Sequence, residues 1–550
     1  MSAQNFYLHI DGNTNTESKI IDSLGYSSIH KGAKSIQNEV NRISQKLSQL
    51  GFLENNIHSL DKKNDSTYTS LLIIGKQIKS VHIYIGENSE LNRFISQNQD
   101  SIFIPFPDVE NFLNQTLQKA EQKGFALSEL KLDNIKQKDQ ILFATLNFSL
   151  GNPRTINTIV VNYSNSNTIK EALPKGHLKQ LNKKYQKQTF NKNTIQKIYR
   201  DFEKFRFVSQ VKYPETLLLK DTTKIYVYLE RRQSNNFDGY IGFNTDSNSK
   251  LILNGYLDLT LENTIKAGEQ FSLYWKSDGN NQKTFRTNLE LPYIFNTNFG
   301  IKAQINIFKQ DSIFQNTKTA LDLGYLINYN TRVYLGYQST ESSDIQNSNS
   351  NSIQDFNNSY LTANLEYIDL DYETSLFPEK TKISIKTGIG KRTSNILIED
   401  TESIKQFYID IKASYTFEFN KRNYFNINSQ NFYLSSSHYL INELYRFGGT
   451  KSLRGFAENS FQAQYINTIL TEYRYIVSSN LYVHSIFDYS IFKDPFSPEK
   501  RTENLSGIGL GIGLLTKNGL LKITLANGIE KNQKTDFYST IISLNYNIQF

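Results

Sequence analysis

From about residue 237 to its end, the chain alternates between apolar and polar residues with a period of two. In the segment LILNGYLDLTLE (251–262) the leucines fall on one face of an extended strand, and Asn254, Asp258 and Thr260 fall on the other. The final segment, IISLNYNIQF (541–550), alternates in the same way. A helix would repeat every 3.6 residues instead, so this half of the chain is predicted to be all β.

The number of such segments narrows the choice of β fold. Sixteen candidate strands begin near residues 238, 250, 269, 283, 298, 317, 331, 357, 381, 406, 422, 463, 480, 504, 518 and 537. Short connections (296–298, 517–519) alternate with long polar ones (339–356, 393–404, 491–503). An even strand number with short turns on one side and long loops on the other is typical of bacterial outer-membrane barrels. We therefore expect a transmembrane antiparallel β-barrel over 237–550; a soluble β domain, which also alternates, is the alternative.

The amino-acid composition is consistent with a membrane barrel and excludes several other kinds of protein. No run approaches the roughly 20 apolar residues that a membrane helix needs, and the mean hydropathy is −0.50. The 34 Tyr and 36 Phe are enough to form aromatic girdles at two membrane interfaces. The absence of cysteine excludes disulfides, thiol catalysis and cysteine-ligated metals. The net charge of +8 is spread along the chain and favours an acidic partner or surface only weakly.

The first 232 residues follow a different, repeating plan. Amphipathic helices are predicted at 34–52 and 109–125, each ending in Gly-Phe, and a third around 195–207. Strand candidates flank every helix, so a small α+β unit recurs at a spacing of roughly 75 residues. We expect three domains, at 4–76, 77–152 and 153–232; one larger α+β domain is the alternative. The opening, MSAQNFYLHI, lacks a signal-peptide pattern, and the membrane strands favour a signal that has been trimmed.

One irregular stretch, FGGTKSLRGF (447–456), does not fit the alternation. Its three glycines suit unusual backbone turns, and the long tract 440–461 around them is a candidate functional loop. A phosphate-binding loop needs Gly directly before Lys-Ser, and Thr450 stands there instead. The other reading is an ordinary glycine-rich loop.

The repeats and this stretch together carry a family resemblance. The three N-terminal units resemble POTRA domains, and the third, with two helices followed by FEKFRFVSQVKY, matches best. POTRA-like repeats before a sixteen-stranded barrel resemble the superfamily that contains BamA, TamA and two-partner secretion transporters such as FhaC. The family carries an Arg-Gly-Phe/Tyr motif on a loop that folds into the barrel lumen, and LRGF (453–456) has that form. The number of modules and the length look most like the TamA branch.

The resemblance implies a set of site residues. The lumen-loop motif comprises Gly448, Gly449, Leu453, Arg454, Gly455 and Phe456. Glu472 and Asp488 are expected to receive the arginine from the barrel wall; a solvated lumen carboxylate is the alternative for each. Gly507, Gly509 and Gly511 share one face of a strand and are expected to leave room for the loop. The barrel seam is expected between the first and last strands, at Tyr240, Gly242, Tyr546 and Phe550.

The implied function is that of a non-enzymatic outer-membrane insertase or translocase with its POTRA-like domains in the periplasm. Exposed sheet edges would bind unfolded outer-membrane or secreted clients, and an accessory lipoprotein or an inner-membrane partner is possible. The alternatives are a two-partner secretion transporter for one exoprotein, a passive porin or adhesin, and a barrel enzyme. With only His438 and His484 in the barrel half, no Ser-His-acid set is evident. No cofactor, metal or nucleic-acid partner is expected.

Overall fold

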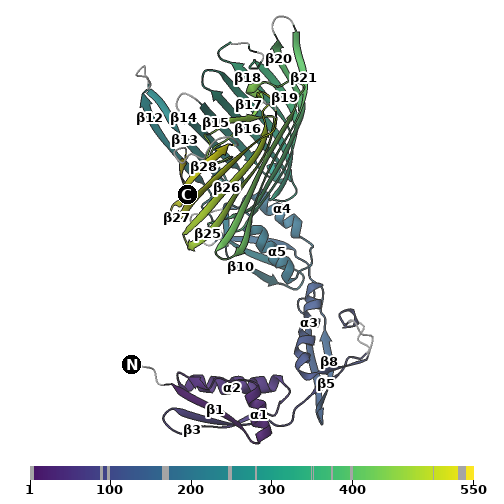
Figure 1. The fold of residues 1–550 in the computed structure, drawn as a ribbon. Coiled ribbons are helices and arrows are strands. Elements are labelled where there is room, and N and C mark those ends of the chain that lie inside the picture. Colours follow the sequence, from purple (N-terminus) through teal and green to yellow (C-terminus); the bar gives the residue numbers. More distant parts are fainter. Residues whose placement is uncertain are drawn as a thin grey trace. The chain divides into compact units, whose positions relative to one another are not determined.

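The structure is a computed structural model of the 550-residue chain. It describes all residues except 1–4, 87–90, 96–99, 164–171, 246–250, 279–281, 348–349, 351, 373–375, 397–399, 499–500 and 531–539. Three small α/β domains come first and a β-barrel follows (Figure 1). No helix in the described residues combines the length and apolarity needed to cross a membrane.

The first domain packs two helices on a mixed sheet. Its elements are β1 (Phe6–Gly12), α1 (Asn15–Ser23), β2 (Ile29–His30), α2 (Ala33–Gln49), β3 (Asn56–Lys62) and β4 (Thr67–Ile73). The strand order is β2-β1-β4-β3, with β1 parallel to β4. The predicted helical stripe is confirmed, because Ile36, Val40, Ile43 and Leu47 of α2 are completely buried in the core of this domain.

The second domain repeats the arrangement. Its elements are β5 (Ser80–Tyr84), η1 (Leu91–Arg93), β6 (Ser101–Pro105), η2 (Phe106–Asp108), α3 (Val109–Gln122), β7 (Glu129–Lys138) and β8 (Ile141–Ser149). The strand order is β6-β5-β8-β7, and β5 is parallel to β8.

The repeated Gly-Phe at the ends of α2 and α3 has a common physical cause. Gly51 and Gly124 both have a φ of 96°, which a residue with a side chain rarely adopts. The N–H of Phe52 donates to Leu47 O at 3.0 Å, and that of Phe125 donates to Ala120 O at 3.0 Å. Both helices therefore end in a Schellman motif, which returns the phenylalanine towards the core.

The third domain holds two helices and three strands: β9 (Thr158–Tyr163), α4 (Lys175–Tyr185), α5 (Lys192–Glu203), β10 (Val208–Leu218) and β11 (Thr223–Arg231). The strand order is β10-β11-β9, with β11 parallel to β9. The prediction of three small α/β domains before a barrel is thus confirmed, and each sheet lies inside one of the predicted ranges 4–76, 77–152 and 153–232.

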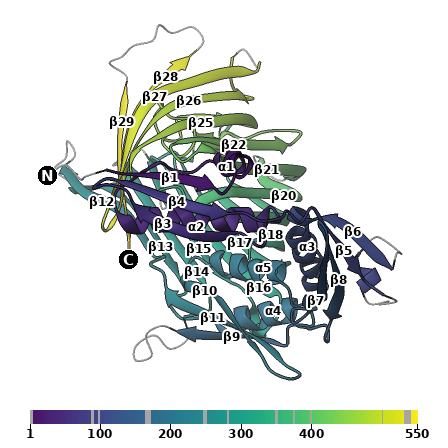
Figure 2. The same ribbon diagram turned by 90° about the horizontal axis from the view of Figure 1, so that it is seen from below.

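The barrel closes with sixteen strands, as predicted. They are β12 (Asn236–Thr245), β13 (Leu251–Glu262), β14 (Gln270–Asp278), β15 (Gln282–Leu291), β16 (Phe299–Gln310), β17 (Phe314–Leu326), β18 (Thr331–Asp344), β19 (Phe356–Leu370), β20 (Glu379–Ile396), β21 (Asp400–Asn420), β22 (Asn423–Ser435), β25 (Tyr465–Ser478), β26 (Leu481–Lys493), β27 (Glu503–Thr516), β28 (Gly519–Glu530) and β29 (Ile541–Gln549). Figure 2 shows β12 beside β29, where the sheet meets itself.

Alternation places apolar residues outside and polar residues inside. On β17, Leu321, Leu323 and Tyr325 are 61%, 55% and 49% exposed on the outer surface, whereas the intervening Asp322 is buried in the interior. The longest connections, 345–355 and 436–464, lie at the end away from the third domain, although that end also has connections of only three residues, such as 311–313. The prediction of a long loop at 393–404 is wrong, because β20 runs to Ile396 and β21 begins at Asp400. The strands extend through this polar segment because antiparallel pairing joins backbone groups and does not depend on the polarity of the side chains.

Two compact units make up the chain. The first comprises residues 1–157, 187–196 and 219–223, and the second comprises 158–186, 197–218 and 224–550. The second unit therefore joins most of the third domain to the barrel. Where the third domain meets the barrel, Arg206 forms a 2.9 Å ion pair with Glu262. Nearby, Gln180 Nε2 donates a hydrogen bond to Asn296 O at 2.9 Å.

His177 of α4 is buried at the same junction. Its ring contacts those of Phe205, Phe207, Tyr293 and Tyr329 at centroid distances of 4.7–5.8 Å. Neither ring nitrogen has a hydrogen-bond partner among the described residues. Burial lowers the pKa of His177 to about 3, so the docked helix carries a neutral imidazole at neutral pH.

Candidate functional site

The glycine-rich stretch lies on the connection between β22 and β25, the eleventh and twelfth barrel strands. The connection contains η4 (Ile441–Glu443), β23 (Tyr445–Phe447) and β24 (Phe461–Ala463). The two short strands pair with each other as a separate sheet, and the motif forms the tip between them. Side chains of the tip contact several barrel strands, so the connection folds into the lumen.

The three motif glycines occupy backbone positions that exclude a side chain. Gly448, Gly449 and Gly455 have φ values of 107°, 100° and 90°. A Cβ on Gly449 would lie 2.2 Å from the Glu458 carboxylate, and a Cβ on Gly455 would lie 2.4 Å from Asn527 C on the barrel wall. The glycines therefore permit both the tight turns of the tip and its close approach to β28.

Two apolar residues of the motif pack the tip in place. Leu453 is completely buried in a cluster that includes Phe447, Phe492 and Leu505. The Phe456 ring contacts Phe461 edge-on, with 5.2 Å between centroids. The motif thus contributes apolar contacts to the barrel wall as well as charge.

Arg454 lies between two wall carboxylates. Its Nε donates to Asp488 Oδ2 at 2.8 Å and its Nη2 donates to Asp488 Oδ1 at 2.6 Å, which is a bidentate pair. Its Nη1 donates to Glu472 Oε1 at 2.5 Å, and its Nη2 also donates to Thr471 O at 3.2 Å. Asp488 is completely buried and Arg454 is 8% exposed. Four of the five guanidinium N–H donors thus have acceptors on the barrel wall, so the loop is held by one planar cation.

The two carboxylates differ in how much they depend on Arg454. Glu472 Oε2 is also 2.8 Å from Arg474 Nη2, and its Oε1 is 2.8 Å from Lys522 Nζ. Asp488 has no other cation within ion-pair distance in the described part of the chain. Loss of the arginine would therefore leave Asp488, and not Glu472, without a counter-charge.

The glycine face of β27 receives the loop at one position. A Cβ on Gly507 would lie 2.2 Å from Arg454 O, so the missing side chain makes room for the loop. The space beside Gly509 and Gly511 is filled by the barrel itself, by Leu525 O at 2.2 Å and the His484 ring at 2.3 Å. This corrects the expectation for Gly509 and Gly511, because the backbone of β28 fills the space beside Gly509 and the His484 ring of β26 fills the space beside Gly511.

Three ion pairs between the loop and the barrel wall were not predicted. Glu443 accepts from Arg392 Nη1 of β20 at 2.5 Å, and these side chains are 2% and 1% exposed. On the opposite wall Lys451 Nζ is 2.5 Å from Asp258 Oδ2, and Lys276 Nζ is 3.1 Å from Glu458 Oε2. The loop therefore spans the lumen. Nothing in the alternation of β20 distinguishes Arg392 from other inward residues, so the sequence offered no signal for this pair.

The seam between β12 and β29 lies nearer the start of β12 than expected. The described pairs are Asn236 with Gln549 and Phe237 with Ile548. Tyr240 and Gly242 pair with β13 instead, opposite Tyr256 and Asn254. The predicted Tyr546 and Phe550 do lie at the seam: Tyr546 N–H donates to Asp238 Oδ1 at 3.3 Å, and Phe550 N–H donates to Asn235 O at 3.1 Å.

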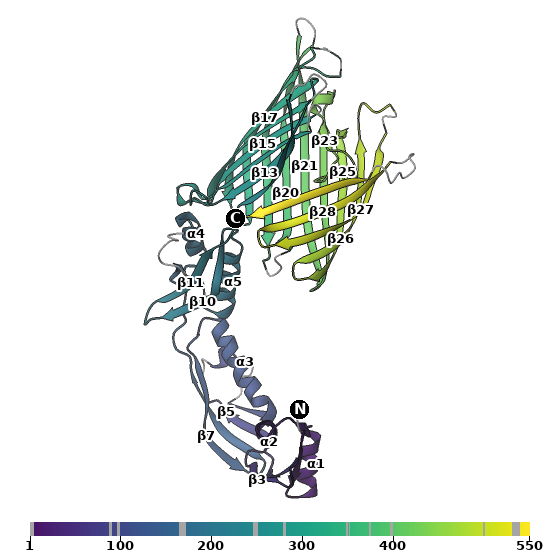
Figure 3. The same ribbon diagram turned by 90° about the vertical axis from the view of Figure 1, so that its left-hand side faces the viewer.

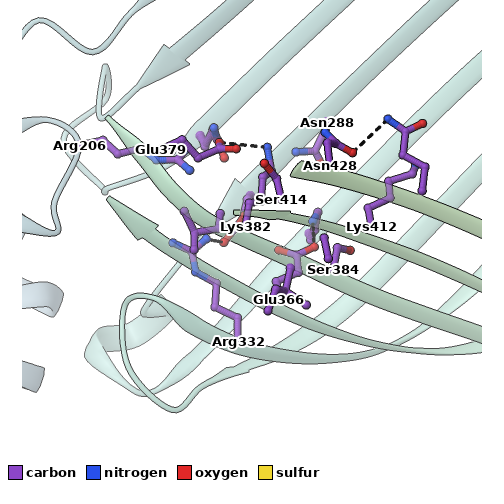
Figure 4. A pocket seen from close by; sticks show the side chains of 17 residues that line it. Arg206, Asn288, Arg332, Glu366, Glu379, Lys382, Ser384, Lys412, Ser414 and Asn428 are labelled. Atoms are coloured by element: carbon purple, nitrogen blue, oxygen red, sulfur yellow. Dashed lines mark hydrogen bonds and ion pairs between the residues drawn. The ribbon is translucent and has the colours of Figure 1, made fainter. Parts of the chain in front are cut away.

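The lumen also holds a polar cavity of about 400 Å³, lined by barrel residues and by Arg206 of the third domain. Figure 4 shows Arg332, Lys382, Glu366 and Glu379 among the side chains that line it. Lys302 Nζ pairs with Glu366 Oε1 at 2.5 Å, so charges of both signs face the cavity. Such an interior suits water and extended polypeptide better than an apolar ligand.

The fold and the site define a class: a closed sixteen-stranded barrel with an arginine-anchored loop in its lumen and three α/β domains before it. CdiB from Acinetobacter baumannii has a similar fold, with a TM-score of 0.50, 13% identity and coverage of 94% of this chain and 97% of that one. BamA from Haemophilus ducreyi lacking POTRA domains 1–3 matches with a TM-score of 0.48 and 14% identity over 85% of this chain and 98% of that chain. CdiB from Escherichia coli gives 0.48 and 10% over 93% and 98%. No protein-family model and no curated protein matches the sequence.

Proposed function

We propose that the protein is a non-enzymatic insertase or translocase of the bacterial outer membrane, with its three α/β domains in the periplasm. The observation that carries the proposal is the weak closure of the barrel. β12 pairs with β13 along its whole length, from Asn236 to Thr245, whereas only its first two residues pair with β29 in the described part of the chain. Separating β12 from β29 would therefore break few backbone hydrogen bonds.

A partly unpaired first strand can accept a client strand. In lipid an open sheet edge is unfavourable because its N–H and C=O groups lack partners. A client β-strand that pairs with β12 would replace the lost hydrogen bonds and keep the edge covered during opening. Such strand pairing does not require any particular client sequence, since the hydrogen bonds form between backbone groups.

The periplasmic domains would deliver clients by the same chemistry. Each of their sheets ends in a strand with one free edge, such as the ten-residue β7 (Glu129–Lys138), most of whose residues are exposed. We propose that unfolded outer-membrane or secreted clients add to these edges before they reach the barrel. An accessory lipoprotein or an inner-membrane partner could use the remaining surface.

A disulfide across the seam tests the proposal. Phe237 and Ile548 face each other between β12 and β29, and the chain has no native cysteine that could interfere. The F237C/I548C variant, when oxidised, should stop assembly of client proteins, and reduction should restore it. The matched control is L525C/I542C, which joins β28 to β29 and leaves the seam free. Normal client assembly in the locked F237C/I548C protein would refute a lateral opening.

A second candidate is a two-partner secretion transporter, the class of CdiB, whose fold this chain shares at a TM-score of 0.50. The three N-terminal domains favour the TamA branch of the insertases over this alternative. Depletion of the protein separates them: an insertase loses several other barrels from the outer membrane, and a secretion transporter loses one exoprotein. A porin would lose only solute flux.

A further inference from the structure

A second cavity, of about 460 Å³, lies where α4 meets the turn end of the barrel. Figure 3 shows α4 close to that end of the barrel. Lys183 and Lys184 of α4 line the cavity together with Lys204, which directly follows α5. Tyr325 of β17 and Ile327, which directly follows that strand, line it from the barrel side. One wall is thus cationic. The other wall, called the apolar wall below, presents Tyr325, Leu326 and Ile327, and the amides of Asn298, Asn328 and Asn330 lie beside them.

The cationic wall carries three lysine amines and the carboxylate of Asp201. Asp201 holds two of the amines, with Lys184 Nζ at 2.6 Å and Lys204 Nζ at 3.4 Å. The Tyr185 hydroxyl donates to the same carboxylate at 2.7 Å and fixes its position. Lys183 is exposed, and no described carboxylate lies within ion-pair distance of it. The exposed amine of Lys183, beside those of Lys184 and Lys204, makes the wall complementary to an anion with several acceptor oxygens.

The apolar wall continues the outer surface of the barrel. Tyr325 and Ile327 are 49% and 57% exposed, and Leu323 follows on the same face at 55%. The cavity therefore opens directly beside the surface that would face acyl chains.

An exposed aromatic side chain marks the same rim. Phe295, in the turn η3 (Ile294–Asn296), is 90% exposed, although a phenyl ring normally avoids water. Its φ of 52° is unusual for a bulky residue, and Gln180 of α4 donates a hydrogen bond to the next residue, Asn296. The turn is held in a strained form that presents the ring at the level of α4, as expected of a side chain that sits at a membrane interface.

We propose that this cavity binds the headgroup phosphate of an anionic phospholipid in the leaflet next to the third domain. The three lysines would contact the phosphate oxygens, and the first part of the acyl chains would lie on Tyr325 and Ile327. The proposal rests on the membrane location proposed above and adds a lipid ligand to it. An acidic client segment would fit the lysines but would leave the apolar wall and Phe295 without a role.

The test uses the full-length purified chain in nanodiscs of dioleoyl phosphatidylcholine doped with dioleoyl phosphatidylglycerol. Native mass spectrometry after release counts the lipids retained. We expect phosphatidylglycerol to be retained selectively. Each basic residue near an anionic surface changes affinity about fivefold, so the charge reversal Lys183→Glu should weaken retention about 25-fold. The control Lys197→Glu reverses an exposed lysine of α5 outside the cavity and should leave retention unchanged.

A second variant tests the apolar wall. I327S should reduce retention of phosphatidylglycerol, because acyl contacts are lost while all three amines remain. Equal retention of the two lipids, or no difference between Lys183→Glu and Lys197→Glu, would overturn the proposal. So would displacement of the lipid by an acidic peptide whose binding ignores I327S, which would assign the cavity to clients. Failure of the purified chain to enter the nanodiscs would instead contradict the membrane location itself.

Discussion

Replacing Arg454 by Ala should release the lumen loop while the barrel stays folded. The substitution removes the bidentate pair with Asp488 and the 2.5 Å contact with Glu472. Glu472 keeps Arg474 and Lys522 at 2.8 Å, so its charge stays compensated. Asp488, completely buried, is left with no cation within ion-pair distance among the described residues.

The expected loss of stability of the closed loop follows from this difference between Glu472 and Asp488. Breaking a buried ion pair by removal of one partner costs about 3–5 kcal/mol, chiefly because the remaining charge stays buried. At 1.36 kcal/mol per factor of ten, the open form of the loop should become roughly 150 to 5,000 times more populated. Most of this free-energy cost should come from the buried, unpaired charge of Asp488. R454A/D488N should therefore recover much of the loss, and R454A/E472Q should recover little.

Hydrogen exchange measures this directly. The N–H of Gly449 donates to Leu453 O at 3.0 Å and that of Ser452 donates to Gly449 O at 3.1 Å, so both amides report on the folded tip. In R454A, hydrogen exchange of the peptide 448–456 should accelerate by the same roughly 150- to 5,000-fold factor. Exchange of barrel peptides and the heat-modifiable migration of the barrel on gels should stay unchanged. Arg422, exposed in a turn, provides the control substitution Arg422→Ala. Equal exchange in R454A and the parent, or equal rescue by D488N and E472Q, would refute the reasoning.

Three further predictions concern the wall, the second attachment and the docked domain. Gly507→Ala should displace the tip, because the new Cβ would lie 2.2 Å from Arg454 O; the same exchange experiment reads it, and unchanged exchange would contradict the close packing. Glu443→Gln leaves the guanidinium of Arg392 buried without its carboxylate and should loosen the loop by about 3 kcal/mol; no increase in protease cleavage of the loop would count against it. His177, with its pKa lowered to about 3 by burial, takes up a proton near pH 6.5 only when undocked. Docking of α4 should therefore weaken by up to about 1.4 kcal/mol per pH unit as the pH falls from about 6.5 to about 3. Exchange in α4 followed against pH tests this, and His177→Phe should abolish the dependence.

The sequence by itself determined the barrel and its strand number. Alternation with a period of two is a local property, because successive side chains of a strand point to opposite faces whatever the strand is paired with. The same holds for the helical stripes of α2 and α3 and for the Gly-Phe ends, where both Schellman hydrogen bonds lie within six residues. The motif around Arg454 and its two carboxylates could be named because the resemblance supplied partners that the spacing alone does not.

Only the tertiary structure decided which inward-facing residues meet. Alternation predicts that Arg392 faces the interior of the barrel, but its contact with Glu443 depends on where the loop crosses the lumen. Gly507 differs from Gly509 and Gly511 for the same reason, since the lumen loop reaches only Gly507, whereas residues of β28 and β26 lie against the other two glycines. The position of the seam and the docking of α4 on the barrel rim are likewise pairings between segments distant in sequence. Local periodicity fixes the face on which a residue lies, whereas its partner is chosen by the closure of the whole sheet.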